Sequence, residues 1–406
     1  MLRRTAALAA LLLLSLPAAA GTLTFANWNL LNYPGSTGLS RAPYFRTALA
    51  EAAPDLLVCQ EVLSASGAQH FFDNVLAVWE PGLWEMAPFH DSYDTDRALF
   101  IRDGVAEVLD WGWLDTDLRD IEWWELRLDA SGDTLRVYSS HLKAGNGSSE
   151  QQRRLAEVQV LRNALDALPP QRAFLFAADL NIYFDTEPAY QLMLSAGPGQ
   201  LFDPIDQAGY WHDNASYAAI HTQSTRTSSF GGGATGGMDD RFDQVLVSEE
   251  LLDGLGLEIL PATYTAFGQD GDHFNQSIIN GGNNAVPAEV ANALHEASDH
   301  LPVLVDFDWP TAVADGAPAA LARVSAWPNP FNPAVRLAVD LPDAGRARLA
   351  VFDTRGRRVA ELLDADLPAG RQTLTWRPEG LASGLYLARL SLDGAPAATA
   401  RLLLVQ

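Results

Sequence analysis

Residues 173–181 read AFLFAADLN, and this stretch decides the fold. Its first six residues are apolar without interruption, which predicts a β-strand buried on both faces. The stretch then ends in two polar residues, Asp179 and Asn181. An unpaired acid has no place at the end of a buried strand, because burying an unpaired charge costs free energy. The polar end therefore indicates a functional site at the mouth of the strand.

More polar clusters follow apolar runs elsewhere in the chain. They are Asn27-Trp28-Asn29, Gln60-Glu61, His141-Leu142-Lys143, Arg241-Phe242-Asp243 and Ser298-Asp299-His300. Several strands that end in this way predict one shared polar site. Carboxylates and carboxamides there can hold a hard cation, and the histidines can move protons.

Strands alternate with helices around these clusters. Helices are expected at 41–53, 68–78, 148–168 and 187–194, and strands at 22–27, 56–61, 98–102, 121–128, 134–141, 173–178, 241–247 and 301–307. Such interleaving predicts an α/β domain of packed sheets covered by helices. With 406 residues, 48% of them hydrophobic and 19% charged, the chain is expected to be globular and to hold at least two domains.

The first twenty residues are expected to be a signal peptide. Arg3 and Arg4 form a basic start, Ala6 to Leu16 are almost wholly apolar, and Ala18-Ala19-Ala20 fits a cleavage site after Ala20. No later stretch reaches the roughly 18 uninterrupted apolar residues of a spanning helix. We therefore expect a bacterial protein that is secreted or held at the cell surface, with no integral membrane segment after cleavage.

Charge and cysteine content limit the possible partners and chemistry. The net charge is −24, and the acidic excess lies ahead of residue 321, a surface that repels polyanions at long range. Lys143 is the only lysine, and its position beside His141 suggests an oxyanion contact. The single cysteine, Cys59, lies in an apolar run and is interpreted as a core residue rather than a nucleophile.

The C-terminal part differs in texture. Residues 310–322 are rich in Pro, Ala, Gly and Asp and predict a linker between a domain at 21–309 and one at 323–406. Short alternating strands are expected at 335–339, 347–353, 372–376 and 385–392, with no helical period. This pattern predicts a small, independently folding β-sandwich.

The polar clusters, in their order and spacing over residues 22–308, resemble the motifs of the endonuclease/exonuclease/phosphatase family, which has the deoxyribonuclease I-like fold. The resemblance implies a four-layer α/β sandwich of two packed mixed β-sheets flanked by helices. It also implies a metal site: Glu61 would bind the divalent cation, with Asn29 and Asp299 in or next to its coordination shell. The cation would normally be Mg²⁺, with Mn²⁺ or Ca²⁺ as alternatives.

The same resemblance implies the catalytic roles. His300 would be the general base on the attacking water, and Asp243 would accept its other N–H. Asp179 would orient that water, Asn181 would donate to a phosphoryl oxygen, and His141 would donate to the phosphate or protonate the leaving group. The alternative interpretation, that these residues only cap strands, suits Asn27, Gln60 and Ser140 but not these acids and histidines.

Three further residues are candidates for substrate contact: Lys143, Arg97 and His273. Arg97 stands where family members often orient the counterpart of His141, although a surface ion pair is an equal alternative. His273 could line the cleft or be a solvated loop residue. The glycine-rich run at 231–237 is interpreted as a flexible rim, because it lacks the lysine of a phosphate-binding loop.

The C-terminal part resembles the sorting domain of the type IX secretion system and the related immunoglobulin-like domain of flagellar hook-capping proteins. The matching residues are Pro328-Asn329-Pro330-Phe331-Asn332-Pro333, Val351-Phe352-Asp353, Gly356-Arg357 and Ala382-Ser383-Gly384-Leu385-Tyr386. The resemblance implies contact with the bacterial outer-membrane secretion machinery. The chain ends without the final lysine common in that family, so cleavage, retention or a purely added domain all stay open.

Taken together, we expect an exported, Mg²⁺-dependent phosphoesterase that hydrolyses phosphodiester bonds, with an extracellular nuclease as the first interpretation. One alternative is a phosphodiesterase or phosphatase acting on lipids or small molecules, similar to sphingomyelinases or inositol phosphatases. Another is a catalytically inert surface adhesin on the same fold. DNA or RNA, endo- or exo-cleavage, the identity of the metal and the oligomeric state are not separated by the motifs.

Overall fold

The computed structural model describes residues 22–254, 256–309 and 322–405, the last range with gaps at 328, 330, 342–343, 354–356, 379 and 393–394. The expected signal peptide at 1–20 lies outside the described residues, as does all but the last residue of the expected linker. Among the described residues, no helix combines the length and the apolar character needed to span a membrane.

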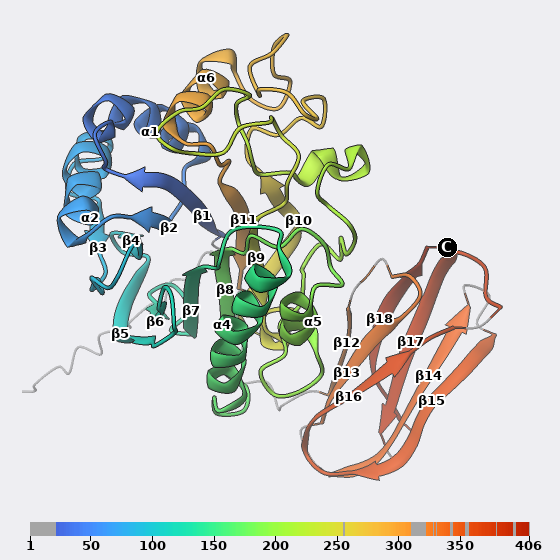
Figure 1. The fold of residues 1–406 in the computed structure, drawn as a ribbon. Helices are drawn as coiled ribbons and strands as arrows, with labels where there is room; N and C mark the ends of the chain where they lie inside the picture. Colours follow the sequence, from blue (N-terminus) through green and yellow to red (C-terminus); the bar gives the residue numbers. More distant parts are fainter. Residues whose placement is uncertain are drawn as a thin grey trace, which may run out of the picture.

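The first sheet of the N-terminal domain is mixed and has the strand order β10-β11-β1-β2-β4-β3. Its strands are β1 (Thr22–Tyr33), β2 (Leu56–Val62), β3 (Trp84–Met86), β4 (Asp96–Arg102), β10 (Glu258–Ala266) and β11 (Val303–Asp308). Strand β1 is parallel to β2 and antiparallel to β11. The first and last strands of the domain therefore lie side by side in its middle (Figure 1).

The second sheet is also mixed and has the order β5-β6-β7-β8-β9. Its strands are β5 (Ala106–Leu114), β6 (Ile121–Leu128), β7 (Thr134–His141), β8 (Phe174–Asp179) and β9 (Asp243–Val247). The register pairs His141 with Asp179 across β7 and β8, and Asp179 with Asp243 across β8 and β9. Three residues expected in the site thus stand side by side on one hydrogen-bonded ladder.

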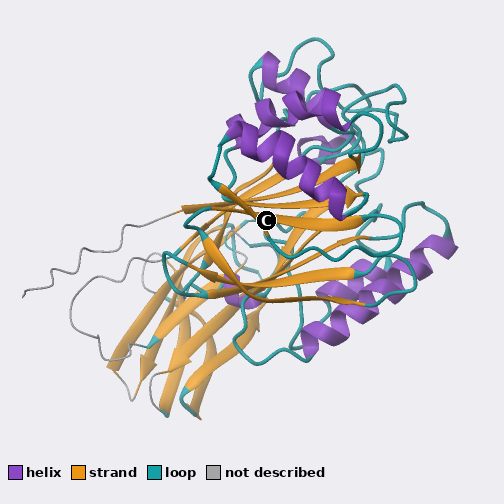
Figure 2. Ribbon diagram, turned by 90° about the vertical axis from the view of Figure 1, so that its left-hand side faces the viewer, coloured by secondary structure: helices purple, strands orange, loops and turns teal. Residues whose placement is uncertain are grey.

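Helices cover the outer face of each sheet, as Figure 2 shows. On the first sheet lie α1 (Gly38–Ala52), α2 (Ala65–Phe71), the π-helical turn η1 (Phe72–Leu76), α3 (Ala77–Trp79) and α6 (Ala288–Ala297). On the second lie α4 (Ser148–Asp166) and α5 (Pro188–Leu194). Two short 3₁₀ turns, η2 (Ala215–Ile220) and η3 (Glu249–Leu251), complete the domain.

Apolar side chains between the two sheets form the central core. Phe25 and Val58 enter it from the first sheet, and Val137, Leu175 and Val245 from the second. Separate clusters fill the space between each sheet and its helices. The order helix, sheet, sheet, helix confirms the predicted four-layer α/β sandwich.

Several elements were not expected from the sequence. Strand β5 has Gly112 between Trp111 and Trp113 and leaves much of its length exposed, and β10 contains Pro261, which weakens a strand pattern. Helix α6 is only ten residues long, and four of them are alanine. The expected helix at 68–78 begins earlier, at Ala65, and passes through a π turn.

The C-terminal domain is an all-β sandwich of two antiparallel sheets. The sheets have the orders β12-β13-β16 and β15-β14-β17-β18, built from β12 (Arg323–Trp327), β13 (Val335–Leu341), β14 (Gly345–Asp353), β15 (Arg358–Leu367), β16 (Gly370–Trp376), β17 (Gly384–Leu392) and β18 (Ala395–Leu404). Its core is its own, with Leu337, Leu349 and Trp376 among the members. Strands β12, β15 and β18 were not expected from the sequence.

Two arginines of the sandwich contact the N-terminal domain. The guanidinium of Arg336 lies 4.5 Å from the centre of the Phe202 ring and donates to Gln200 Oε1 at 3.1 Å. Arg371 forms an ion pair with Asp253. Phe202 bridges to Val247 of β9, so the Arg336 contact lies at the edge of the second sheet opposite β5.

Candidate active site

The site continues the inner faces of both sheets. Along β8, Leu175 and Ala177 point into the central core, and Asp179 is the next residue on that face. Because side chains alternate along a strand, Ala177 and Asp179 are successive residues on this face, and the core changes from apolar to polar between them. His141, the last residue of β7, and Asp243, the first residue of β9, pair with Asp179 from the two neighbouring strands.

Glu61 reaches the site through an irregularity in β2. By alternation it would belong with Leu57 and Cys59, which pack against the helices on the outer face. The register between β2 and β4 shifts between Cys59 and Val62, and Glu61 has a left-handed φ of 56°. An extra residue of this kind re-aims a side chain, and here it turns the Glu61 carboxylate towards Asn29.

Asn29 holds two carboxylates together. Its Nδ2 donates to Glu61 Oε1 at 3.0 Å and to Asp179 Oδ2 at 2.9 Å, while its Oδ1 accepts from the backbone N–H of Leu31 at 2.9 Å. The amide oxygen thus accepts one hydrogen bond and keeps a second lone pair. In this arrangement Asn29 positions Glu61 and Asp179, and its place in or next to the coordination shell stays a prediction.

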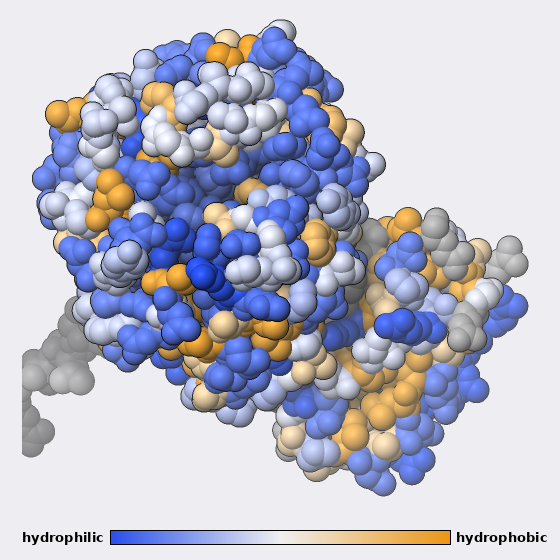
Figure 3. Space-filling view, viewed as in Figure 1, coloured by the Kyte–Doolittle hydropathy of each residue, from blue (hydrophilic) through white to orange (hydrophobic). Residues whose placement is uncertain are grey.

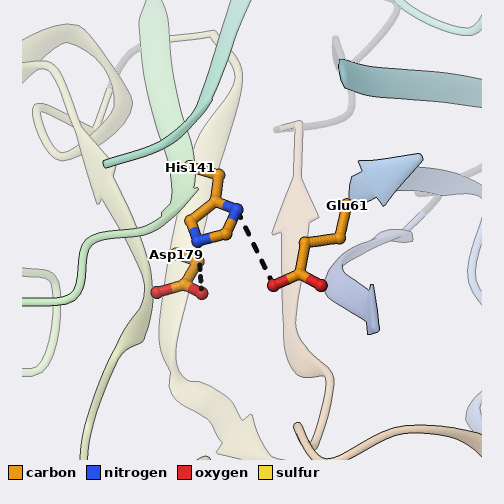
Figure 4. Close-up of side chains that lie close together, drawn as sticks. All are labelled: Glu61, His141 and Asp179. Atoms are coloured by element: carbon orange, nitrogen blue, oxygen red, sulfur yellow. Dashed lines mark ion pairs between the residues drawn. The ribbon is translucent and has the colours of Figure 1, made fainter. Parts of the chain in front are cut away.

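His141 lies between those two carboxylates (Figure 4). Its Nδ1 is 3.7 Å from Glu61 Oε1, and its Nε2 is 3.6 Å from Asp179 Oδ2. Donor atoms of the three residues all lie within 4.8 Å of one another. Since Nδ1 of His141 is buried without a hydrogen-bond partner among the described residues, it has spare capacity for a ligand.

His300 is fixed by its neighbours on every side. Its Nδ1 pairs with Asp243 Oδ2 at 2.7 Å, and its Nε2 is 3.7 Å from Asp179 Oδ2. Its carbonyl accepts from Trp28 Nε1 at 2.9 Å, and its N–H donates to Ser298 Oγ at 3.2 Å. With one ring nitrogen held by a carboxylate, the other faces the centre of the site.

The two histidines have opposite electrostatics. Burial lowers the pKa of His141 well below its usual value, and the cations of Arg119, Arg97 and Lys143 lower it further. Burial also acts to lower the pKa of His300, but the carboxylates of Asp243, Asp299 and Asp179 outweigh it. The pKa of His300 is therefore raised well above its usual value. His141 is neutral at pH 7, and His300 binds a proton readily.

The acidic residues fit a hard divalent cation. Burial raises the pKa of Glu61, and the nearby charge of Asp299 raises it further, so the two carboxylates repel each other. Asp299 Oδ2 accepts from the Ala234 N–H at 2.6 Å, but its Oδ1 is buried with no hydrogen-bond partner among the described residues. A cation held by Glu61 and Asp299 would relieve the repulsion and use the orphaned oxygen.

Asn181 is beside Asp179, as expected, but its amide points inwards. Its Nδ2 donates to Asp179 Oδ1 at 2.9 Å and to the Leu142 carbonyl at 3.3 Å. Its backbone N–H also donates to Asp179 Oδ1, at 3.1 Å. In this conformation Asn181 orients Asp179, and a bond to a phosphoryl oxygen requires the amide to turn.

Two of the expected substrate contacts need correction. The guanidinium of Arg97 is buried, and each of its nitrogens donates to a protein acceptor, chiefly the carboxylate of Glu122. His273 is also buried, with Nδ1 on Asp270 Oδ1 at 2.7 Å and Nε2 3.1 Å from the Asn280 carbonyl. Both residues stabilise the protein's own structure and have no free polar atom to offer a substrate.

Lys143 lies on the loop that leaves β7. Its ammonium donates to the Ala144 carbonyl at 2.8 Å, and its side chain is half-buried. It is among the cations that lower the pKa of His141, so its charge is felt at the site. A role for Lys143 in binding an anionic substrate remains a proposal.

A hydrogen-bonded layer supports the site from below. Gln60 Nε2 donates to Asn27 Oδ1 at 2.6 Å and to Ser139 Oγ at 3.0 Å, and Asn27 Nδ2 donates to the Ala178 carbonyl at 3.4 Å. These buried bonds join β1 and β2 of the first sheet to β7 and β8 of the second. They fix the spacing of the two sheets directly under the polar cluster.

Two contributors were not expected from the sequence. Gln223 Nε2 lies 2.5 Å from His300 Nε2, and the glycine-rich run at 231–237 supplies the N–H that holds Asp299. A Cβ on Gly233 would lie 2.6 Å from Asp299 Oδ2, so the run packs closely against the site rather than forming a loose rim. The sequence signal for the glycine-rich run was its glycine content, because glycine allows a backbone to approach a neighbour closely. Gln223 does not follow an expected strand, so no pattern in the sequence pointed to it.

Comparison with known proteins gives similar folds only. No family model matches the chain, and no curated protein sequence matches it. Solved structures do match. An endonuclease/exonuclease/phosphatase family protein from Bacteroides thetaiotaomicron is 17% identical, covers 72% of this chain and 99% of its own, and has a TM-score of 0.46.

Other similar structures carry varied names. A mannosyl-6-phosphatase from Bacteroides thetaiotaomicron is 16% identical over 70% of this chain and 99% of its own, with a TM-score of 0.45. The catalytic domain of human Nocturnin, solved with a bound sulfate, is 15% identical over 71% of this chain and 95% of its own, with a TM-score of 0.44. At such values the chemistry must be argued from this chain's own residues.

Proposed function

We propose that this chain is a divalent-cation-dependent phosphoesterase that hydrolyses phosphodiester bonds. The observation that carries the proposal is the convergence of Glu61, His141, Asp179 and the His300–Asp243 pair. These residues come from the two sheets and from the segment before β11, yet neighbouring members lie within 4 Å of each other. Hydrolysis of a phosphodiester needs charge neutralisation, an aligned water and a route for protons, and this cluster offers all three.

His300 is assigned as the general base. A water between His300 Nε2 and Asp179 Oδ2, atoms 3.7 Å apart, could bond to both. As its oxygen attacks phosphorus and the bond to the leaving oxygen breaks, its proton passes to Nε2. Asp243 holds the Nδ1–H, fixes the tautomer and stabilises the imidazolium that forms.

Glu61 and Asp299 are assigned as the cation ligands, with Asn29 positioning Glu61. When bound, the cation would supply positive charge to the phosphoryl oxygens of the substrate. We assign Mg²⁺ first, because hard oxygen donors in small number suit it, and Mn²⁺ or Ca²⁺ as alternatives.

His141 is assigned to hydrogen-bond donation rather than to proton transfer. Its lowered pKa keeps the ring neutral near pH 7, so it carries one N–H and no spare proton. A neutral imidazole at this position can donate to a phosphate oxygen or to the departing oxygen. The sequence also allowed His141 to protonate the leaving group, and the lowered pKa disfavours that role.

We propose nucleic acid as the substrate and an extracellular nuclease as the activity, because a hydrolase exported by the expected signal peptide would meet nucleic acid outside the cell. The visible face in Figure 3 is largely hydrophilic, and the net charge of −24 opposes long-range attraction of polyanions. Bound cations and the local field of Lys143 and Arg119 near His141 matter more at contact distance. Lipid and small-molecule phosphodiesters are the alternative substrates.

A substrate panel with Mg²⁺, with and without EDTA, tests the proposal. Plasmid DNA, RNA, sphingomyelin, inositol phosphates and bis-p-nitrophenyl phosphate cover the candidate classes. We expect turnover of plasmid DNA or RNA and of bis-p-nitrophenyl phosphate, all abolished by EDTA. Turnover that survives EDTA, or none on any substrate, would reject the phosphoesterase; turnover of sphingomyelin alone would reject the nuclease.

A further inference from the structure

The side chain of Gln223 contacts the reactive nitrogen of His300. Gln223 Nε2 is 2.5 Å from His300 Nε2, closer than the 3.7 Å that separates the same nitrogen from Asp179 Oδ2. Gln223 is partly exposed, whereas His300 is 1% exposed. The amide therefore lies between the ring nitrogen and the solvent side of the site.

Backbone hydrogen bonds hold the segment around Gln223 beside His300. The Gln223 carbonyl accepts from the N–H groups of Asp239 at 2.9 Å and Asp240 at 3.0 Å. On either side, the Thr222 carbonyl accepts from Leu301 N at 2.7 Å, and Thr225 N donates to the Asp299 carbonyl at 3.1 Å. The segment is thus bonded both to residues just ahead of β9 and to the segment that carries His300, which brings Gln223 next to His300.

The direction of the hydrogen bond follows from the partner at the other nitrogen. Asp243 accepts the Nδ1–H of His300. In the unprotonated form that a general base requires, Nε2 carries a lone pair, so a group facing it must donate, and an amide N–H does. The same amide also carries an oxygen, which can accept a hydrogen from a water that enters beside it.

We propose that Gln223 is a positioning residue for the proposed hydrolysis. Its N–H holds the Nε2 side of His300 next to Asp179, and it yields that place to the attacking water during turnover while its oxygen helps to orient this water. The inference rests on the proposed function, because it assigns His300 as the base. Gln223 touches the base rather than the substrate, so it acts through His300.

Isosteric variants separate hydrogen bonding from space filling. Gln223→Met keeps the length without polar atoms, and Gln223→Glu keeps length and oxygen but cannot donate when ionised. With Mg²⁺ and bis-p-nitrophenyl phosphate, we expect kcat to fall about 10- to 100-fold in both, with KM within about twofold. Gln159→Met, on the exposed face of α4, is the matched control and should keep wild-type kcat. Wild-type kcat in Gln223→Met would overturn the proposal.

A second measurement does not depend on turnover. In protein labelled with ¹⁵N-histidine, the His300 Nε2 resonance of the wild type should differ from that of Gln223→Met at the same pH, and Gln159→Met should match the wild type. An unchanged His300 resonance in Gln223→Met would overturn the contact. This measurement can be made even if the wild type is inactive on every substrate. Failure of the proposed function and failure of the Gln223 contact are therefore distinguishable.

Discussion

At the scale of single residues, the Asp243–His300 pair controls the pH range in which the base works. The pKa of His300 is raised, and Asp243 is the leading cause after burial, which opposes it. A base must be unprotonated, so activity should rise as the pH rises through this pKa. Asp243→Asn removes the negative charge, lowers the pKa of His300 and should move the acidic limb of the pH–kcat/KM profile to lower pH.

The same variant should also lower the rate. Without the carboxylate at Nδ1, the imidazolium that forms during the reaction is no longer stabilised, and kcat should fall about 100-fold or more. The pH profile and the plateau rate are read from one series of kcat/KM measurements. An acidic limb that stays in place or moves to higher pH would contradict the assignment of Asp243.

Cation binding and base catalysis should separate in two other variants. Glu61→Gln removes one of the two assigned ligand carboxylates, so Mn²⁺ or Mg²⁺ binding by calorimetry should weaken about tenfold or more, and activity should be lost. His300→Ala should abolish turnover while cation binding survives. The reverse pattern, in which His300→Ala loses the cation and Glu61→Gln keeps it, would contradict both roles.

The residue types in the site were predictable, but their partners were less so. Acids and histidines at the ends of apolar runs stand out because a buried charge needs a reason. Arg97 was expected near the substrate, but its guanidinium forms an ion pair with Glu122, which lies on another strand. Asn29 was expected in or next to the coordination shell, but its bonds to both Glu61 and Asp179 were not expected. Such pairings are properties of the folded chain.

At the scale of elements, the glycine-rich run at 231–237 shapes the cation site. A methyl group at Gly233 would lie 2.6 Å from Asp299 Oδ2 and 2.8 Å from Leu31 Cδ1. Gly233→Ala should therefore displace Asp299, weaken Mn²⁺ binding several-fold and destabilise the fold by about 1–3 kcal/mol. Calorimetry and urea unfolding measure the two effects.

Gly232→Ala is the matched control for this prediction. Gly232 has a φ of 86° but nothing within 4 Å of an added Cβ. Its substitution should cost about 1–2 kcal/mol through backbone strain and leave Mn²⁺ affinity unchanged. Equal loss of affinity in both variants would show that the run does not act through Asp299.

Helix α1 fixes the end of β1 through one buried arginine. Arg41 donates to the carbonyls of Leu30 at 2.6 Å, Leu31 at 2.9 Å and Ala297 at 3.0 Å, so it ties β1 to the end of α6. Arg41→Met would leave three buried acceptors unsatisfied and should lower the free energy of unfolding by about 2–4 kcal/mol in urea titrations. Arg153→Met, on an exposed position of α4, should change it by less than about 0.5 kcal/mol.

Long and uninterrupted elements were predictable, and short or interrupted ones were not. The continuous apolar run of β8 follows directly from its residues, and so does the long helix α4. Pro261 interrupts the strand pattern of β10, and α6 is short and rich in alanine. Their structure depends on what they pack against, namely β11 for β10 and α1 for α6, which single-chain periodicity does not contain.

At the scale of the whole molecule, the two domains have separate cores. The three core clusters of the N-terminal domain contain no residue of the sandwich, and the sandwich core contains none of theirs. Residues 21–309 expressed alone should therefore fold, with kcat within about twofold of the full chain. Circular dichroism and the bis-p-nitrophenyl phosphate assay provide the measurement. Loss of folding on truncation would show that Arg336 and Arg371 do more than join two stable domains.

The ladder that carries His141, Asp179 and Asp243 limits how this protein can diversify. Since neighbouring side chains on a strand face opposite ways, inserting one residue into β8 would rotate its acid into the helix layer and dismantle the pair contacts on both flanks at once. Changes of length are tolerable only in the connections beyond the strand ends. Variation in what the protein recognises is thus expected to accumulate in those connections, while the strands that present the chemistry keep their length.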